Sequence, residues 1–239
     1  MNPEVFTQEL LEALGERLMT VALYGSAVAE DVSKQHSNVN LLVVCDRLGL
    51  PELDLLSPLA VKWARAGNPP PLFFTHERLL NSSHVFPIEL LDIKENHRIL
   101  YGTNVLRALP INQENLQFQL EHELKGKLIQ LRENYLLISH SDGEVLDLMF
   151  QSLSAFQVMA KASLRFYVVD VPVKKREAVK LLSRHVFFDV SIFEELQALR
   201  EGVGALSHSG EQMRELFARY LDTIEHLADQ IAGLGRKRE

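Results

Sequence analysis

The sequence of 239 residues contains a single cysteine, Cys45, and therefore cannot form an intrachain disulfide. It also lacks any apolar run near the roughly 20 residues that a membrane-spanning helix needs. Its first residues lack the basic and apolar regions of a secretory signal peptide. From these absences we expect a cytoplasmic protein without a membrane anchor, in which Cys45 is a small core residue.

Basic residues are also scarce, since 25 lysines and arginines stand against 32 aspartates and glutamates, for a net charge of −7. A domain that binds nucleic acid over a broad surface usually carries an excess of basic residues. The charge therefore argues against such a surface, although it is compatible with a local basic cleft.

One pattern near the N-terminus carries chemical information. Apolar residues lead into Gly25-Ser26, as a buried strand does when it enters a turn. After eleven further residues come Asn38 and Asn40, which stand two apart and therefore share one face of the next strand. The apolar run 41–44 follows, which is typical of a central strand of a sheet.

This pattern resembles the signature of the nucleotidyltransferase superfamily, which shares the DNA polymerase β fold and has Gly-Ser followed by Asp-x-Asp on the next strand. The resemblance implies a nucleoside triphosphate (NTP) and Mg²⁺ as cofactors. It implies that Gly25 lets the backbone approach the triphosphate. It also implies that Ser26 donates hydrogen bonds to a phosphate at a helix start.

The chain departs from this signature because Asn38 and Asn40 replace the two metal-binding aspartates. An amide oxygen can coordinate Mg²⁺ but brings no charge, and Mg²⁺ favours charged oxygen ligands. The resemblance places the third metal-binding carboxylate at Glu89, on a strand expected over 86–93, with Asp92 as the second choice. Glu89 is thus the expected metal ligand, and Asn38 and Asn40 hold degenerate catalytic positions with weakened Mg²⁺ binding.

A simpler interpretation of the asparagines stays open at this stage. Asn38 can be a turn residue, and Asn40 can be a buried amide that bonds only to backbone groups. Under the resemblance, by contrast, Ser26, Asn38, Asn40 and Glu89 converge in one cleft.

The periodicity of apolar residues changes near Pro110, where strand-like runs stop and long helical stripes begin. This change predicts an α/β (α+β) nucleotidyltransferase-like domain with a mixed sheet over 1–108, followed by an all-α helical bundle over 112–235. The capping box that starts at Ser191 predicts one of the bundle helices. Together the two domains resemble the arrangement of kanamycin nucleotidyltransferase and its small bacterial relatives.

In those enzymes a glutamate of the helical domain acts as general base, a part that Glu121 or Glu123 could play only if it faced the cleft. A solvated helix face is the alternative for both residues. The paired-helix HEPN nucleases need an arginine and a histidine at a spacing that this chain does not show, which argues against a ribonuclease.

Three functions remain open from the sequence. The first is a nucleotidyltransferase-like protein that binds nucleotide with weak or no transfer activity. The second is an active metal-dependent enzyme that moves a nucleoside monophosphate from an NTP to a small-molecule, protein or RNA hydroxyl. The third is a ligand-free interaction module, and we expect a homodimer held by the bundle. Binding of ATP separates the first two from the third, and turnover separates the second from the first.

Overall fold

The computed structural model describes residues 2–25, 28, 39–169, 171, 174–203 and 210–236. Backbone contacts divide the chain after Asn112 into two compact units, which we call the N-terminal unit (1–112) and the helical unit (113–239). No helix among the described residues combines the length and apolar character needed to cross a membrane.

The N-terminal unit is built around a sheet of four strands in the order β3-β2-β1-β4. Strands β2 and β3 run parallel, and the other neighbours run antiparallel, so the sheet is mixed as the sequence predicted. Its elements are α1 (Pro3–Leu14), η1 (Gly15–Arg17), β1 (Leu18–Tyr24), β2 (Asn40–Cys45), α3 (Leu50–Arg65), β3 (Leu72–Thr75), α4 (His76–Ser82), α5 (Pro87–Glu95), β4 (His97–Gly102) and η2 (Val105–Ala108).

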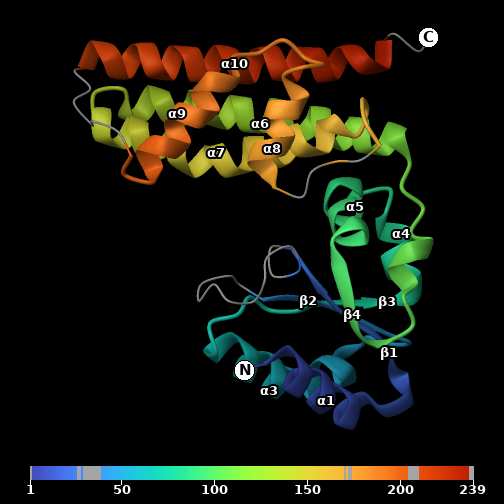
Figure 1. Ribbon diagram of the computed structural model, residues 1–239. Helices are drawn as coiled ribbons and strands as arrows, with labels where there is room; N and C mark the ends of the chain where they lie inside the picture. Colours follow the sequence, from blue (N-terminus) through green and yellow to red (C-terminus); the bar gives the residue numbers. More distant parts are fainter. Residues whose placement is uncertain are drawn as a thin grey trace. The chain divides into compact units, whose positions relative to one another are not determined.

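Alternation along the strands gives the sheet two apolar faces. Leu41 and Val43 of β2 point to the face covered by α1 and α3, where the rings of Phe6 and Trp63 lie 4.8 Å apart (Figure 1). This face of the sheet is therefore buried by α1, which precedes β1 in the sequence, and by α3, which follows β2.

The other face of the sheet carries a second apolar cluster. Leu42 and Val44 point to this side, where they pack with Leu79 of α4 and with Leu90 and Ile93 of α5 (Figure 1). Because β2 is apolar on both faces, it is a central strand, as its unbroken apolar run indicated.

The segment 86–93, expected as a strand, is instead the start of helix α5. Pro87 occupies the beginning of this helix, where a missing N–H costs nothing and the fixed φ suits the first turn. The strand prediction was wrong because nine residues are too few for apolar periodicity to separate a short helix from a strand. Glu89 therefore lies in the first turn of a helix and not on the sheet.

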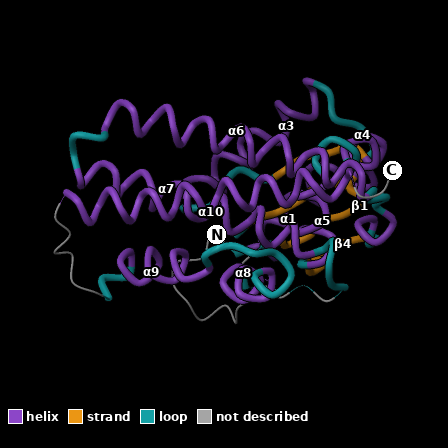
Figure 2. The backbone as a smooth tube through the Cα atoms, turned by 90° about the horizontal axis from the view of Figure 1, so that it is seen from above, coloured by secondary structure: helices purple, strands orange, loops and turns teal. Residues whose placement is uncertain are grey.

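The helical unit contains only helices among its described residues, in agreement with the predicted all-α second half. They are α6 (Gln113–Ile138), α7 (Asp142–Leu164), α8 (Lys175–Leu182), α9 (Val190–Arg200) and α10 (Gly210–Arg236). Helices α6, α7 and α10 run side by side (Figures 1 and 2). Tyr135 of α6 stacks on Phe217 of α10 at 4.1 Å, and Phe156 of α7 meets Tyr220 of α10 edge-on at 5.9 Å.

The N-cap of helix α9 lies two residues before the expected cap, Ser191. Asp189 is the N-cap, and its carboxylate accepts the backbone N–H of Ser191 at 3.0 Å. An aspartate caps a helix about as well as a serine, so residue type alone does not favour Ser191 over Asp189.

Candidate functional site

Gly25 and Asn40 meet where β1 ends and β2 begins. Gly25 has a φ of 81°, a left-handed conformation that glycine adopts without strain, and its carbonyl accepts the N–H of Val28 at 3.0 Å. Tyr24, the last residue of β1, pairs with Asn40 across the sheet. A Cβ atom added to Gly25 would lie 3.0 Å from Nδ2 of Asn40, so the amide of Asn40 lies close against the turn.

Two further residues of the expected site, Ser26 and Asn38, lie outside the described residues. Their roles at the phosphate and at the degenerate metal position stay predictions. Gly25 and Asn40 are thus the two motif residues that the structure brings together.

A row of polar side chains crosses three strands at this end of the sheet. Tyr24 pairs with Asn40 on one side and with His97 of β4 on the other. Directly opposed residues of antiparallel strands point to the same face, so all three side chains point to the face covered by α4 and α5. The sequence did not indicate Tyr24 or His97, because only long-range strand pairing places them beside Asn40.

Tyr24 is half-buried, and burial raises the pKa of its phenol above the ordinary value. The hydroxyl therefore stays protonated at neutral pH, and it can donate a hydrogen bond as well as accept one. At this position it offers a neutral polar group beside Asn40, not a charge.

The imidazole of His97 is engaged in holding β4 to its neighbours. Its Nδ1 lies 3.0 Å from the carbonyl oxygens of Ile93 and Lys94, and its Nε2 lies 2.9 Å from Nδ2 of Asn104. Carbonyl oxygens only accept, so these contacts match the tautomer that carries its proton on Nδ1 and accepts at Nε2. Both ring nitrogens are thereby used within the fold.

This end of the sheet does not offer the ligands that a pair of magnesium ions requires. The four strands contain no aspartate or glutamate, and Leu72 takes the first position of β3, beside Leu42 of β2. Among the described residues, no group of three or more histidine, cysteine, aspartate or glutamate side chains could hold a metal ion. The residues described here therefore do not fit the metal pair that the nucleotidyltransferase signature implies.

The two carboxylates that the sequence offered as a third metal ligand lie on α5. Glu89 is exposed in the first turn, whereas its neighbours Ile88 and Leu90 are buried. Helix α5 leads directly into β4 at His97, and at 1.5 Å per residue Glu89 lies roughly 9 Å before the end of the helix. Asp92 stands closer to that end, and its Oδ1 accepts Nδ2 of Asn96 at 3.2 Å.

The glutamates considered as a general base lie on α6 in the helical unit. Glu121 forms an ion pair with Lys125 one turn further along the helix. Such pairs are common on solvated helix surfaces. A catalytic role for Glu121 or Glu123 stays a prediction.

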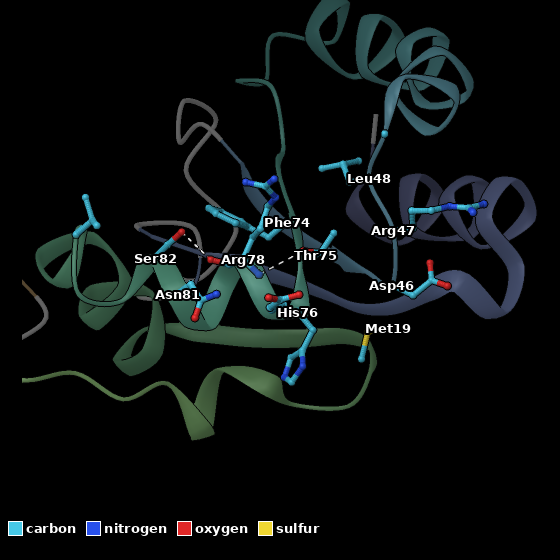
Figure 3. A pocket seen from close by; sticks show the side chains of 13 residues that line it. Met19, Asp46, Arg47, Leu48, Phe74, Thr75, His76, Arg78, Asn81 and Ser82 are labelled. Atoms are coloured by element: carbon cyan, nitrogen blue, oxygen red, sulfur yellow. Dashed lines mark hydrogen bonds between the residues drawn. The ribbon is translucent and has the colours of Figure 1, made fainter.

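A hollow of about 1100 Å³ lies at the other end of the sheet (Figure 3). It is lined by residues where β2 and β3 end, among them Asp46, Thr75 and His76, together with Met19 at the start of β1. Neither Gly25 nor Asn40 lines it, because these residues lie at the opposite ends of β1 and β2. This hollow is therefore not the site that the motif predicted.

No protein-family model matches the chain, and no curated protein matches it. Among solved structures it resembles the spectinomycin adenyltransferase of Enterococcus faecialis, crystallised with ATP and spectinomycin, with a TM-score of 0.53 and 14% identity over 94% of this chain and 100% of that chain.

Two further solved structures match less well. A nucleotidyltransferase-like protein from Exiguobacterium sibiricum gives a TM-score of 0.44 and 16% identity over 96% of this chain and 75% of that chain. A mutant of the toxin–antitoxin pair MntA–HpeT gives a TM-score of 0.34 and 19% identity over 55% of this chain and 99% of that chain. The match to the adenyltransferase extends over both units, and the chain therefore has the fold of the nucleotidyltransferase superfamily.

Proposed function

We propose that this chain is a nucleotidyltransferase-like protein that binds a nucleotide at the Gly25–Asn40 end of its sheet, with weak or no transfer activity. One observation carries the proposal. The turn at Gly25 and its contact with Asn40 are present, whereas the strands that would supply metal-binding carboxylates contain none. The geometry for approaching a phosphate is retained without the charge for holding two metal ions.

The resemblance to the adenyltransferase crystallised with ATP supports a nucleotide as the ligand. A left-handed glycine at the end of a strand lets a phosphate approach the backbone without meeting a Cβ atom. The amide of Asn40 and the protonated hydroxyl of Tyr24 can both donate hydrogen bonds to a ligand there. These donors are neutral, so binding by them does not depend on a divalent cation.

Efficient transfer needs two metal ions that stabilise the attacking and leaving oxygens. Charge-assisted contacts are about twice as strong as neutral ones, so amide oxygens in place of carboxylates weaken a metal site strongly. We therefore propose that this chain still binds a nucleotide although its transfer activity is weak or lost. The phosphates of a bound nucleotide can recruit Mg²⁺ weakly in place of the missing carboxylates.

The test is calorimetry with ATP, GTP, CTP and UTP, each with and without Mg²⁺ or Mn²⁺. We expect at least one nucleotide to bind without a divalent metal, and no release of pyrophosphate. Micromolar binding of Mg²⁺ without nucleotide would contradict the weakened metal site, and sustained pyrophosphate release would establish an active enzyme. If no nucleotide binds at all, the chain is an interaction module, and size-exclusion chromatography with light scattering then tests the expected homodimer.

A matched pair of variants locates the binding site. Gly25 and Gly67 are both left-handed, with φ values of 81° and 85°, so an alanine strains the backbone similarly at either position. Only at Gly25 would the added Cβ meet another group, the amide of Asn40, whereas at Gly67 nothing lies within 4 Å. We expect Gly25→Ala to weaken nucleotide binding by at least about tenfold, and Gly67→Ala to leave it unchanged.

A further inference from the structure

A small pocket in the helical unit lies between α7, α8 and α9. It has a volume of about 190 Å³, and all the residues that line it belong to these three helices or directly flank them. Val179, Phe193 and Ala198 give it apolar walls, and the side chain of Gln157 on α7 also lines it. The pocket is smaller than the roughly 300–1,000 Å³ of pockets that hold drug-sized molecules, so it suits a small ligand.

Gln157 is the unusual residue of this pocket. Only 5% of its surface is exposed, yet its amide makes no hydrogen bond within the part of the chain that the structure describes. Neither amide atom of Gln157 is among the fully buried side-chain atoms without a partner, so the exposed part of this side chain includes the amide, which water in the pocket can reach. The amide lines the pocket, so a molecule inside the pocket can supply the missing partner.

Gln197 shows how a buried glutamine in the same pocket is satisfied. It is also nearly buried, but its Nε2 donates to Oε1 of Glu201 at 3.0 Å, and its Oε1 accepts from Nη2 of Arg200 at 3.2 Å. Both ends of this amide are thereby used by the protein. Of the two glutamines that line the pocket, Gln157 is therefore the one whose amide donor and acceptor are not used by the described part of the protein.

Two ion pairs join α8 to the α9 region beside the pocket. Arg176 pairs with Glu201, and Lys180 pairs with Glu194 at 2.7 Å. All four side chains line the pocket, and their two positive and two negative charges cancel. The pairs hold the walls together without a ligand, and the cancelled charge favours a neutral ligand over a phosphate or a carboxylate.

We propose that this pocket binds a small, neutral, planar molecule with a hydrogen-bond donor beside an acceptor, as found on an aromatic carboxamide or a free nucleobase. The amide of Gln157 carries a donor and an acceptor side by side, so it can pair with such an edge through two bonds. Phe193 supplies an aromatic surface for the flat body of the ligand. Without a ligand, water occupies the polar end and is displaced on binding.

The experiment measures binding of four probes to the full chain by ligand-observed NMR and calorimetry. Benzamide and adenine both carry the required donor–acceptor edge. Comparing them shows whether the pocket favours an aromatic carboxamide or a free nucleobase. Benzoate tests the effect of charge, and toluene tests the effect of losing the polar edge. We expect benzamide or adenine to bind at least about tenfold more tightly than either benzoate or toluene.

Variants of the protein assign the binding to this pocket. Gln157→Leu keeps the side-chain volume but removes the amide, so it should weaken binding of the amide-edged probe by at least about tenfold. Gln151→Leu makes the same change at an exposed position of the same helix and should leave binding unchanged. Ala198→Leu fills the pocket from α9 and should abolish binding even if Gln157→Leu does not fold.

The proposal is overturned if neither benzamide nor adenine binds the wild-type protein. It is also overturned if a probe binds equally well to Gln157→Leu, or equally well to a folded Ala198→Leu variant. Each of these results would mean that the amide of Gln157 forms hydrogen bonds to water alone. The proposed nucleotide site at Gly25 is untouched by these variants, so the two proposals fail independently.

Discussion

The amide of Asn40 lies close against the turn at Gly25, and under the proposed function it takes the position of a carboxylate in the nucleotidyltransferase signature. An amide and a carboxylate have nearly the same shape but differ by a full charge. The backbone geometry can therefore be retained while metal affinity is lost. This separation of shape from charge is what the proposed function rests on.

Restoring the two carboxylates tests this residue-scale argument. The double variant Asn38→Asp with Asn40→Asp adds two negative charges, so we expect Mg²⁺ to bind more tightly than in the wild type. Without metal the variant should be less stable, because the new carboxylates repel each other. A magnesium titration followed by calorimetry and by melting temperature measures both effects.

The control for this variant adds the same charge elsewhere, through Asn68→Asp with Asn134→Asp in solvent-accessible positions. It should bind Mg²⁺ no better than the wild type does. Equal Mg²⁺ binding by the two double variants would contradict the proposal that Asn38 and Asn40 weaken the metal site. Micromolar binding of Mg²⁺ to the wild type without nucleotide would contradict it as well.

Gly102, at the end of β4, is required by close backbone contact. Its φ is 77°, and a Cβ atom added there would lie 1.9 Å from the carbonyl oxygen of Met19 on β1. That distance is far inside van der Waals contact with backbone, which cannot swing away as a side chain can. Glycine is therefore fixed here by both conformation and space.

We expect Gly102→Ala to lower the free energy of unfolding by about 3 kcal/mol or more, because strain and overlap add. The matched control is Gly126→Ala within α6, where nothing lies within 4 Å of the added Cβ. That change should instead stabilise the protein, by up to about 1 kcal/mol, through helix propensity. Urea denaturation of both variants measures the difference, and equal effects would refute the close-contact argument.

At the scale of elements, Glu52 connects three segments of the N-terminal unit. Its carboxylate accepts the backbone N–H of Gly49 at 2.9 Å, Nε of Arg47 at 3.1 Å and Nη1 of Arg17 at 3.4 Å. These bonds join the start of α3 to η1 and to the loop after β2. The Gly49 bond and the nearby arginine lower the pKa of this nearly buried carboxyl.

The lowered pKa predicts how stability depends on pH. A carboxyl with a depressed pKa in the folded state stabilises the protein above its unfolded pKa of about 4.3, and that contribution is lost as the pH falls through the folded value. Glu52→Gln should therefore lower the melting temperature clearly at pH 7, with a deficit that shrinks below pH ~4. Glu16→Gln, at an exposed position of η1, is the control and should change little at either pH.

Thermal melts of both variants between pH 3 and pH 7 provide the measurement. A deficit for Glu52→Gln that stays constant across this range would contradict the electrostatic origin of the effect. It would assign the loss to packing of the amide instead of to the missing charge.

At the scale of the whole molecule, the chain consists of two compact units with separate cores. In the N-terminal unit, strands distant in sequence pair in the sheet. In the helical unit, α6, α7 and α10 bury a common set of apolar residues, including Leu120, Phe156 and Ile224. We propose that the two units are domains that can each fold alone.

The fragment 113–239 tests this proposal. It should be helical by circular dichroism and should melt in one cooperative transition, because its helices bury one another's apolar stripes within the fragment. A matched comparison with Leu120→Ala in the fragment should lower its stability by about 2–5 kcal/mol, as for a large core deletion. A fragment that is unfolded or melts without cooperativity would show that the helical unit depends on the N-terminal unit.

The sequence by itself determined what local patterns can encode. β1 and β2 are marked by apolar runs that stand next to turn or polar residues, and α6, α7 and α10 are marked by apolar stripes that continue along their whole length. The asparagines at 38 and 40 and their departure from a carboxylate pair are likewise visible in the sequence alone. From these the fold class followed.

Only the tertiary structure decided which residues meet. Helix α5 was mistaken for a strand because it is short, and with it Glu89 moved from the sheet to an exposed helix turn. His97 joined Tyr24 and Asn40 through strand pairing over more than 50 residues, which no local pattern indicates. Gln157 is one more polar residue of a helix in the sequence, and only the packing of α7, α8 and α9 places it in the wall of a pocket. Such juxtapositions depend on long-range packing, and packing is a property of the folded chain.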